Sequence, residues 1–269
     1  MRDYLIPNFQ PILDTHGTVH AYEAFMRLKG DDSGTAGFIP RWERSRLIST
    51  ADNSMIDQVG ALSCQSAYRG SLRFNLNIST VSIDSDSRSL AAKLGEVRPL
   101  TRGLTVELPH LAVQHNYQRL LEFTHLCKFH QIDIALEGAE LGMAFTSRRF
   151  LETLHPNFIK IDSRYLMELR GTPQYAEMLK AIDMARTLGI HAIVKNIDSA
   201  DGHKAATLSG ARYFQGRFFA SESATVPPPD QTHRLTIRPR GIHLAGNGRL
   251  ARVIGPVRRL FGAHGEEAA

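Results

Sequence analysis

Residues 6–28 read IPNFQPILDTHGTVHAYEAFMRL, and this stretch decides the fold. Apolar and β-branched residues dominate positions 6–13 and 19–28, which is typical of two β-strands. The link Asp14-Thr15-His16-Gly17 is a turn sequence that is too short to hold a crossover helix. We therefore predict an antiparallel hairpin at the start of the chain.

Six further apolar runs follow the hairpin and alternate with longer segments of helical spacing. The predicted strands cover residues 72–78, 104–108, 132–136, 158–161, 191–194 and 211–214, and the predicted helices cover residues 55–68, 117–130, 175–188 and 200–209. This alternation is typical of βα units around a parallel sheet. Eight strands in about 220 residues favour an α/β fold, a TIM-like (β/α)8 barrel with an irregular antiparallel first strand. A doubly wound open sheet is the alternative, although no glycine-rich phosphate loop follows an early strand.

The positive charge of the chain lies at its C-terminal end. The net charge is +5, but residues 231–265 hold seven arginines and no acid, Glu266 and Glu267 follow, and residues 1–230 balance to zero. The main body therefore gives no electrostatic indication of nucleic-acid binding. Pro227-Pro228-Pro229 predicts a boundary between a barrel over residues 1–225 and a basic tail over residues 226–269. We expect the tail to be a solvated, disordered segment, with contact to a membrane or a protein as the alternative.

The sequence also gives an expectation for the cellular location of the protein. No apolar run approaches about 18 residues, and no secretory leader begins the chain, so we expect a soluble, cytoplasmic protein. The two cysteines, Cys64 and Cys127, lack the spacing of metal ligands and are predicted to be buried thiols.

Polar side chains stand near the carboxyl ends of seven predicted strands. They are Glu23 and Arg27, Asn75 and Asn77, Glu107, Glu137, Lys160 and Asp162, Lys195 and Asp198, and Gln215. Any one of them is explained equally well as a solvated loop residue. Seven strands in series predict a shared site, because the ends of barrel strands converge. Oxygen ligands suited to Mg²⁺ or Mn²⁺ are available from Glu23, Asn77, Glu107 and Glu137.

Several of these residues lie in motifs that resemble the EAL domain family over residues 8–220. The motifs are Gln10-Pro11-Ile12-Leu13 with Ala21-Tyr22-Glu23-Ala24-Phe25-Met26-Arg27, then Phe74-Asn75-Leu76-Asn77-Ile78-Ser79, Val106-Glu107-Leu108-Pro109-His110, Lys160-Ile161-Asp162 and Phe214-Gln215-Gly216. Active members of that family open cyclic di-GMP with two metal ions. The resemblance therefore implies the barrel fold and a place in cyclic di-GMP signalling.

The resemblance also implies roles for individual residues. The catalytic places fall on Lys160 and Glu23, and the metal-ligand places fall on Glu23, Asn77, Glu107 and Glu137. The expected nucleotide contacts are Gln10, Arg27, Asp57, Asp162 and Gln215. Lys195 is added to them because its charge can replace that of a metal ion beside a phosphate.

The sequence departs from the family where the metals should bind. The family's Asp-Asp-Phe-Gly-Thr-Gly loop reads Glu137-Gly138-Ala139-Glu140-Leu141-Gly142, so its second aspartate is missing. A metal-linked glutamate is replaced by Lys195, and the second glutamate of another motif is replaced by His110. These changes predict that the catalytic and metal places are vestigial, because two metal ions need more carboxylates than remain.

Three functions stay open at this point. The preferred interpretation is a catalytically inactive receptor for cyclic di-GMP that needs no cofactor. The second is a protein-interaction regulator that binds no nucleotide, and the third is a weak phosphodiesterase that uses Mg²⁺ or Mn²⁺. A protein partner is expected, and the sequence leaves a homodimer open.

Overall fold

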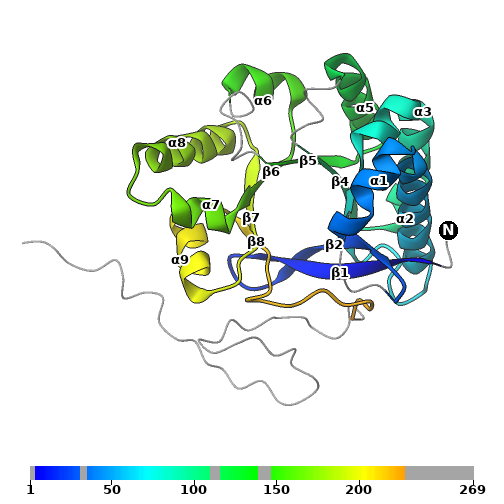
Figure 1. The fold of residues 1–269 in the computed structure, drawn as a ribbon, viewed down its shortest axis with the longest axis horizontal. Helices are drawn as coiled ribbons and strands as arrows, with labels where there is room; N and C mark the ends of the chain where they lie inside the picture. The colour runs from blue at the N-terminus through cyan, green and yellow to red at the C-terminus, as the bar shows by residue number, and fades with distance from the viewer. Residues whose placement is uncertain (1–3, 31–34, 110–115, 139–146, 228–269) are drawn as a thin grey trace, which may run out of the picture.

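A closed eight-stranded barrel forms the centre of the protein in the computed structural model, which describes residues 4–30, 35–109, 116–138 and 147–227 (Figure 1). The strands are β1 (Leu5–Asp14), β2 (Val19–Leu28), β3 (Arg73–Asn77), β4 (Gly103–Leu108), β5 (Asp133–Glu137), β6 (Phe158–Asp162), β7 (His191–Lys195) and β8 (Tyr213–Phe214). β1 is antiparallel to both of its neighbours, β2 and β8, whereas strands β2 to β8 are parallel. The predicted barrel and its opening hairpin are confirmed.

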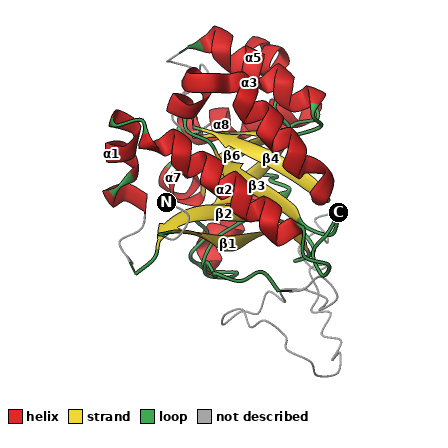
Figure 2. Cartoon of the chain, turned by 90° about the vertical axis from the view of Figure 1, so that its right-hand side faces the viewer, coloured by secondary structure: helices red, strands yellow, loops and turns green. Residues whose placement is uncertain are grey.

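Helices lie on the outside of the barrel, where Figure 2 shows them around the strands. They are α1 (Ile39–Arg44), α2 (Leu47–Ser63), α3 (Thr80–Val97), α5 (Tyr117–Phe129), α6 (Arg148–Leu154), α7 (Ser163–Glu168), α8 (Pro173–Thr187) and α9 (Ala200–Leu208), with short 3-10 turns η1 (Thr35–Gly37) and η2 (Arg98–Leu100). In the described part of the chain, no helix is both long and apolar enough to cross a membrane.

The sequence missed or misplaced several helices. It predicted no helix between β3 and β4, yet α3 occupies that link because Ile83, Leu90 and Leu94 are buried against the core. Serines and aspartates between these residues have low helix propensity, which obscured the pattern. α2 begins eight residues before its predicted start, and the short helices α1, α6 and α7 were not predicted. Cys127 is buried as expected, but Cys64 is exposed at the end of α2, where the helix leaves the core.

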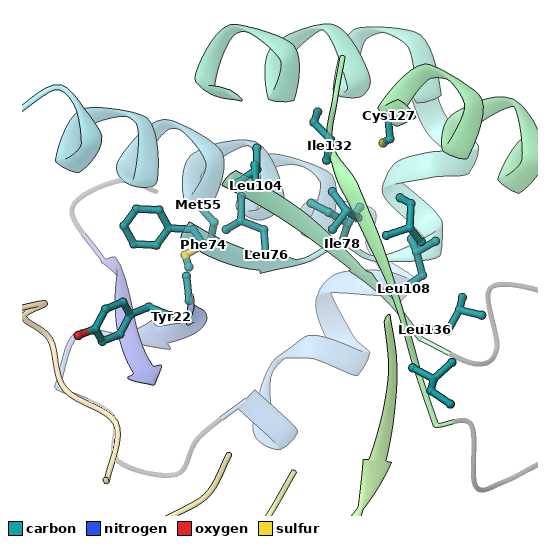
Figure 3. Close-up of a cluster of buried hydrophobic side chains, with 14 of the residues drawn as sticks. Tyr22, Met55, Phe74, Leu76, Ile78, Leu104, Leu108, Cys127, Ile132 and Leu136 are labelled. Carbon is teal, nitrogen blue, oxygen red and sulfur yellow. The ribbon is translucent and has the colours of Figure 1, made fainter. Parts of the chain in front are cut away.

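Side chains alternate between the two faces of the strands and build two separate apolar cores. The larger core lies between strands and helices, and Figure 3 shows Phe74 and Leu76 of β3 in it together with Met55 of α2. The smaller core consists of Ile12, Ala21, Ala135, Phe158, Ile193 and Tyr213. Ile12 of β1 pairs with Ala21 near the start of β2, and Tyr213 lies at the start of β8. The cluster therefore fills the half of the barrel interior that is nearer the amino ends of the parallel strands. Polar side chains are left for the half nearer the carboxyl ends.

The predicted tail falls almost entirely outside the described residues. Its first residue, Val226, is buried in the larger core, and its carbonyl oxygen accepts a hydrogen bond from the Tyr68 hydroxyl at 2.7 Å. The chain after β8 therefore remains attached to the barrel up to this point.

Gly216 fixes the chain immediately after β8. The Ile197 amide donates to the Gln215 carbonyl at 3.0 Å, and the Phe218 amide donates to the Ile197 carbonyl at 2.9 Å. A Cβ atom on Gly216 would lie 2.1 Å from the Ile197 carbonyl oxygen, and its φ of +156° also disfavours other residues. Only glycine fits here, and its fit determines how Gln215 enters the barrel.

We predict that Gly216→Ala lowers the free energy of unfolding by about 3 kcal/mol or more, because backbone must move to admit the methyl group. Gly171→Ala is the matched control, since Gly171 also has a positive φ, +84°, but no atom within 4 Å of an added Cβ. The control should cost only about 1 kcal/mol. Urea denaturation measures both, and equal losses in the two variants would contradict the close approach at Gly216.

Candidate functional site

A buried lysine holds two glutamates together in the polar half of the barrel. The Nζ atom of Lys160 on β6 lies 2.6 Å from Glu23 Oε2 on β2 and 2.6 Å from Glu107 Oε2 on β4. All three side chains are almost completely buried, and Lys160 has no exposed surface. Removing one partner from a buried ion pair typically costs roughly 3–5 kcal/mol, because a charge is left uncompensated. The triad therefore ties together three strands that are not neighbours in the sheet.

Amide side chains satisfy the remaining oxygen atoms of the two glutamates. Asn77 Nδ2 donates to Glu23 Oε1 at 2.8 Å, and Asn75 Nδ2 donates to Glu107 Oε1 at 2.8 Å. Gln215 Nε2 donates to Glu23 Oε2 at 2.8 Å and to Gln10 Oε1 at 3.2 Å. The set explains how two carboxylates and one ammonium can be buried together, since every charged oxygen has a donor.

Interactions among the three charges give the two glutamates very different pKa values. Burial alone would raise the pKa of Glu23, but the Lys160 ammonium and the hydrogen bonds around it lower that pKa to about 2. Burial raises the pKa of Glu107 to about 8, and the neighbouring Glu23 carboxylate adds to this rise against the pull of Lys160. Burial opposes the charge of Lys160 too, yet the facing Glu107 and Glu23 carboxylates raise its pKa above the ordinary value. Lys160 therefore stays charged, and Glu107 is the member of the triad that most readily takes a proton.

A second lysine pairs with the third predicted acid ligand. The Nζ atom of Lys195 on β7 forms an ion pair with Glu137 Oε1 on β5, and both side chains are partly exposed, at 20% and 28%. β6 lies between these strands and carries Lys160 opposite Glu137 in the sheet. Two ammonium groups therefore stand among three carboxylates at this end of the barrel.

Two further predicted nucleotide contacts, Arg27 and Asp162, pair with other residues of the protein. Arg27 pairs with Glu222, Nη2 to Oε1 at 2.6 Å. Asp162 accepts from Arg164 and, at 2.8 Å, from Asn196 Nδ2. Burial would raise the pKa of Asp162, but these hydrogen bonds lower it below the ordinary value.

Asp57 is the predicted contact that the structure does not bring to the site. Its carboxylate lies 2.8 Å from Lys93 Nζ, in a contact between α2 and α3 on the outside of the barrel. Its side chain therefore lies away from the strand ends at which the other predicted contacts stand. Asp198, noted at the end of β7, forms an exposed ion pair with Arg217 at 2.7 Å.

Asp52 is the aspartate of α2 that reaches the strand ends, and sequence reasoning missed it. Its Oδ2 atom accepts from the Ser79 amide at 3.0 Å and from the Ser82 hydroxyl at 2.6 Å, just beyond the end of β3. Burial raises its pKa from 3.8 to about 7, against the effect of both hydrogen bonds. A signal was present, because Asp52 stands at helical spacing between Ile48 and Met55 on the apolar face of α2.

The arrangement of donors limits what the acids can bind. The oxygens of Glu23 and Glu107 accept from N–H groups of lysine, asparagine and glutamine, and Glu137 faces Lys195. Among the residues that the structure describes, no three or more His, Cys, Asp or Glu side chains are grouped to hold a metal ion. His110 and Glu140, at two positions where the sequence departs from the EAL pattern, lie outside the described residues.

Comparison with known proteins gives the family. The sequence matches the EAL domain over residues 2–222, which is most of the chain. The chain belongs to the EAL domain family. The predicted family is thus confirmed, and the barrel is the EAL barrel.

Relatives of this EAL domain include a protein named for cyclic di-GMP. It is 23% identical over 224 residues, 80% of its length, to the "Probable cyclic di-GMP phosphodiesterase PdeG" of Escherichia coli (strain K12). The chain spans less than half the length of this relative, 44%.

Solved EAL structures share the fold. The Xanthomonas citri FimX EAL domain in complex with c-di-GMP is 18% identical, with a TM-score of 0.68 over 84% of this chain and 91% of that one. The Bacillus subtilis YkuI protein, solved with c-di-GMP and calcium, is 20% identical with a TM-score of 0.68 over 86% of this chain and 59% of that one. This EAL domain is thus related to c-di-GMP phosphodiesterases and to EAL structures that hold the dinucleotide.

We predict that Asp52 makes the stability of this EAL domain fall as pH rises. Its pKa is higher in the folded chain, about 7 against 3.8, so between these values the folded state binds more protons than the unfolded state. The free energy of unfolding should fall by up to about 1.4 kcal/mol per pH unit over that window. Asp52→Asn should remove this contribution.

Urea denaturation at several pH values between 4 and 8 measures the effect as a difference between the wild type and Asp52→Asn. Asp183→Asn, on the exposed surface of α8, is the control and should keep the wild-type pH dependence. Parallel curves for the wild type and Asp52→Asn would show that Asp52 titrates at its ordinary pKa.

Proposed function

We propose that this EAL domain is a receptor that binds cyclic di-GMP without hydrolysing it. The ion pair between Lys195 and Glu137 carries the proposal, because it puts a fixed positive charge on an acid that the family resemblance assigns to a metal. A domain that keeps the residues expected to contact the nucleotide, but has lost residues expected to bind the metals, can bind the nucleotide without hydrolysing it.

The charge balance does not fit a two-metal centre. Glu23, Glu107 and Glu137 face the ammonium groups of Lys160 and Lys195, so the set keeps at most one negative charge, and none when Glu107 is protonated. Two divalent ions would add about four positive charges and would have to displace N–H donors from the oxygens they bind. Gly138 supplies no carboxylate to offset them. The site therefore favours internal ammonium groups over divalent cations.

Loss of the metals would remove the hydrolytic step while leaving contacts to the ligand. Metal ions in such sites generate the attacking hydroxide from water at neutral pH. Lys160 does not replace them as a base, since the facing carboxylates keep it protonated. Lys195, which is partly exposed, instead offers a charged donor to a phosphate oxygen, as lysine does at other phosphate sites.

The glutamine pair beside the triad supports a place for a ligand. Gln10 and Gln215 are joined side chain to side chain, and Gln10 Nε2 also donates to the Ala220 carbonyl at 3.0 Å. The buried Oε1 atom of Gln215 receives no hydrogen bond from the described residues. A buried acceptor without a donor costs about 1–3 kcal/mol, and a ligand or water that supplies an N–H or O–H group recovers it.

The names of the relatives agree with this ligand class. The structures of the FimX EAL domain and of YkuI were solved with c-di-GMP, and PdeG is named as a probable phosphodiesterase of the same dinucleotide. One observation favours the alternative of a protein-interaction module without nucleotide: Arg27 and Asp162 already have partners inside the chain. A nucleotide-binding measurement separates the two functions.

We predict that the wild type binds cyclic di-GMP in excess EDTA with a Kd below about 100 μM. Lys195→Met should weaken binding by about tenfold or more, because a charged hydrogen bond to phosphate is lost. Lys180→Met, on the exposed surface of α8, is the matched control and should bind like the wild type.

Isothermal titration calorimetry measures these affinities, and product analysis after incubation with Mn²⁺ tests for cleavage. No binding at about 100 μM dinucleotide would favour the interaction module. Linear product that accumulates with Mn²⁺ would establish a weak phosphodiesterase instead.

Restoring the two acids should restore metal binding. We predict that Lys195→Glu with Gly138→Asp binds Mn²⁺, whereas the wild type does not, because the pair adds two negative charges and removes a positive one. The positive φ of Gly138, +77°, will cost the variant about 1 kcal/mol of stability.

Calorimetric titration with Mn²⁺ checks this result, with Lys180→Glu as a control for a charge reversal outside the site. Metal binding should return before activity does. A stable double variant without Mn²⁺ binding would mean that the two positions do not account for the altered site.

A further inference from the structure

The segment after β8 returns across the open edge of β1. Residues 220–226 form this strap, and Figure 1 shows it in orange beside β1. Phe9 and Ser223 exchange two backbone hydrogen bonds, at 2.7 and 3.0 Å, as an antiparallel bridge. Gln10 Nε2 donates a hydrogen bond to the Ala220 carbonyl, and the Tyr68 hydroxyl donates one to the Val226 carbonyl. The strap is therefore fixed at its beginning, middle and end.

The strap places one carboxylate on Arg27. Arg27 Nη2 lies 2.6 Å from Oε1 and 2.5 Å from Oε2 of Glu222, and the side chains are 18% and 28% exposed. Ser223 pairs with Phe9, so the two residues face the same side of the sheet. The neighbouring Glu222 therefore faces the same side as Gln10, which is the barrel interior. Arg27 lies on that side too, because Ile6 opposite it is an even number of residues from Gln10 along β1.

The other contacts of Arg27 leave it available for anions. Its Nη1 atom donates to the Met26 carbonyl at 2.8 Å, and its guanidinium lies over the Phe25 ring at 5.2 Å. These contacts orient the group without neutralising it, so Glu222 supplies the paired negative charge. A carboxylate and a phosphodiester both present two oxygens that share one negative charge, and guanidinium binds either.

We infer that Glu222 is an internal competitor for the phosphate site on Arg27 and so sets the affinity for a phosphodiester ligand. This inference rests on the proposed function, because it takes Arg27 to contact the nucleotide. The ligand must displace the Glu222 carboxylate before its phosphate reaches the guanidinium. Only molecules in which the ion pair is open can bind, so the measured affinity is the intrinsic affinity multiplied by the open fraction.

The test compares Glu222→Gln with the wild type in calorimetric titrations with cyclic di-GMP. The amide keeps the size of the side chain and removes its charge, so the Kd should fall about tenfold. Glu96→Gln is the control, since Glu96 is exposed near the end of α3 that is remote from the strand ends, and its Kd should match the wild type. Hydrogen exchange at the Phe9 and Ser223 amides checks that the strap stays on β1.

The same substitution in an Arg27→Ala background shows whether Glu222 acts through Arg27. The double variant should bind no more tightly than Arg27→Ala alone. If Glu222→Gln tightens binding equally in both backgrounds, the effect is general repulsion and the inference is overturned.

The two proposals fail in different ways. A wild type that binds, with a Glu222→Gln variant of unchanged Kd, overturns the competitor and leaves the receptor standing. Binding by Glu222→Gln alone supports the competitor but contradicts the receptor function proposed for the wild type, because the closed ion pair then excludes the nucleotide. No binding by any variant at about 1 mM dinucleotide overturns both.

Discussion

The ion triad of Lys160, Glu23 and Glu107 is the constraint on which the polar half of the barrel depends. An ammonium without exposed surface is stable there only because two carboxylates lie 2.6 Å from it. Those carboxylates in turn need the amides of Asn75, Asn77 and Gln215. The site is therefore built into the packing of the fold, and its members cannot be altered one at a time without a cost in stability.

A different balance applies at the exposed edge of the site. The Lys195–Glu137 and Arg27–Glu222 pairs are partly open to solvent, where ion pairs contribute little to stability and are easily exchanged for other partners. Both pairs consist of a cation suited to phosphate and an acid that occupies it. The protein thus separates a rigid, buried set of charges from an adjustable set around it, and ligand recognition by such a protein would draw on the second.

The sequence predicted the strands well and their side-chain partners poorly, for a physical reason. Strand pattern is local, and the alternation in segments such as residues 72–78 needs no distant information. Residue types at strand ends therefore indicated Glu23, Lys160 and Gln215 correctly as one cluster. Partner choice depends on packing across long separations: Arg27 meets Glu222 only because the strap returns to β1, and Asp57 turns to Lys93 because α3, unpredicted, lies beside α2.

The antiparallel direction of β1 has a consequence for how the barrel connects to anything joined to it. In a barrel of parallel strands, the first strand enters at the end remote from the catalytic loops. Here Leu5 pairs with Leu28, and the Lys29 amide donates to the Tyr4 carbonyl at 2.8 Å, so β1 enters at the rim that carries Arg27. A domain joined ahead of Tyr4 would therefore be attached at that rim, close to Arg27, and not at the opposite end of the barrel.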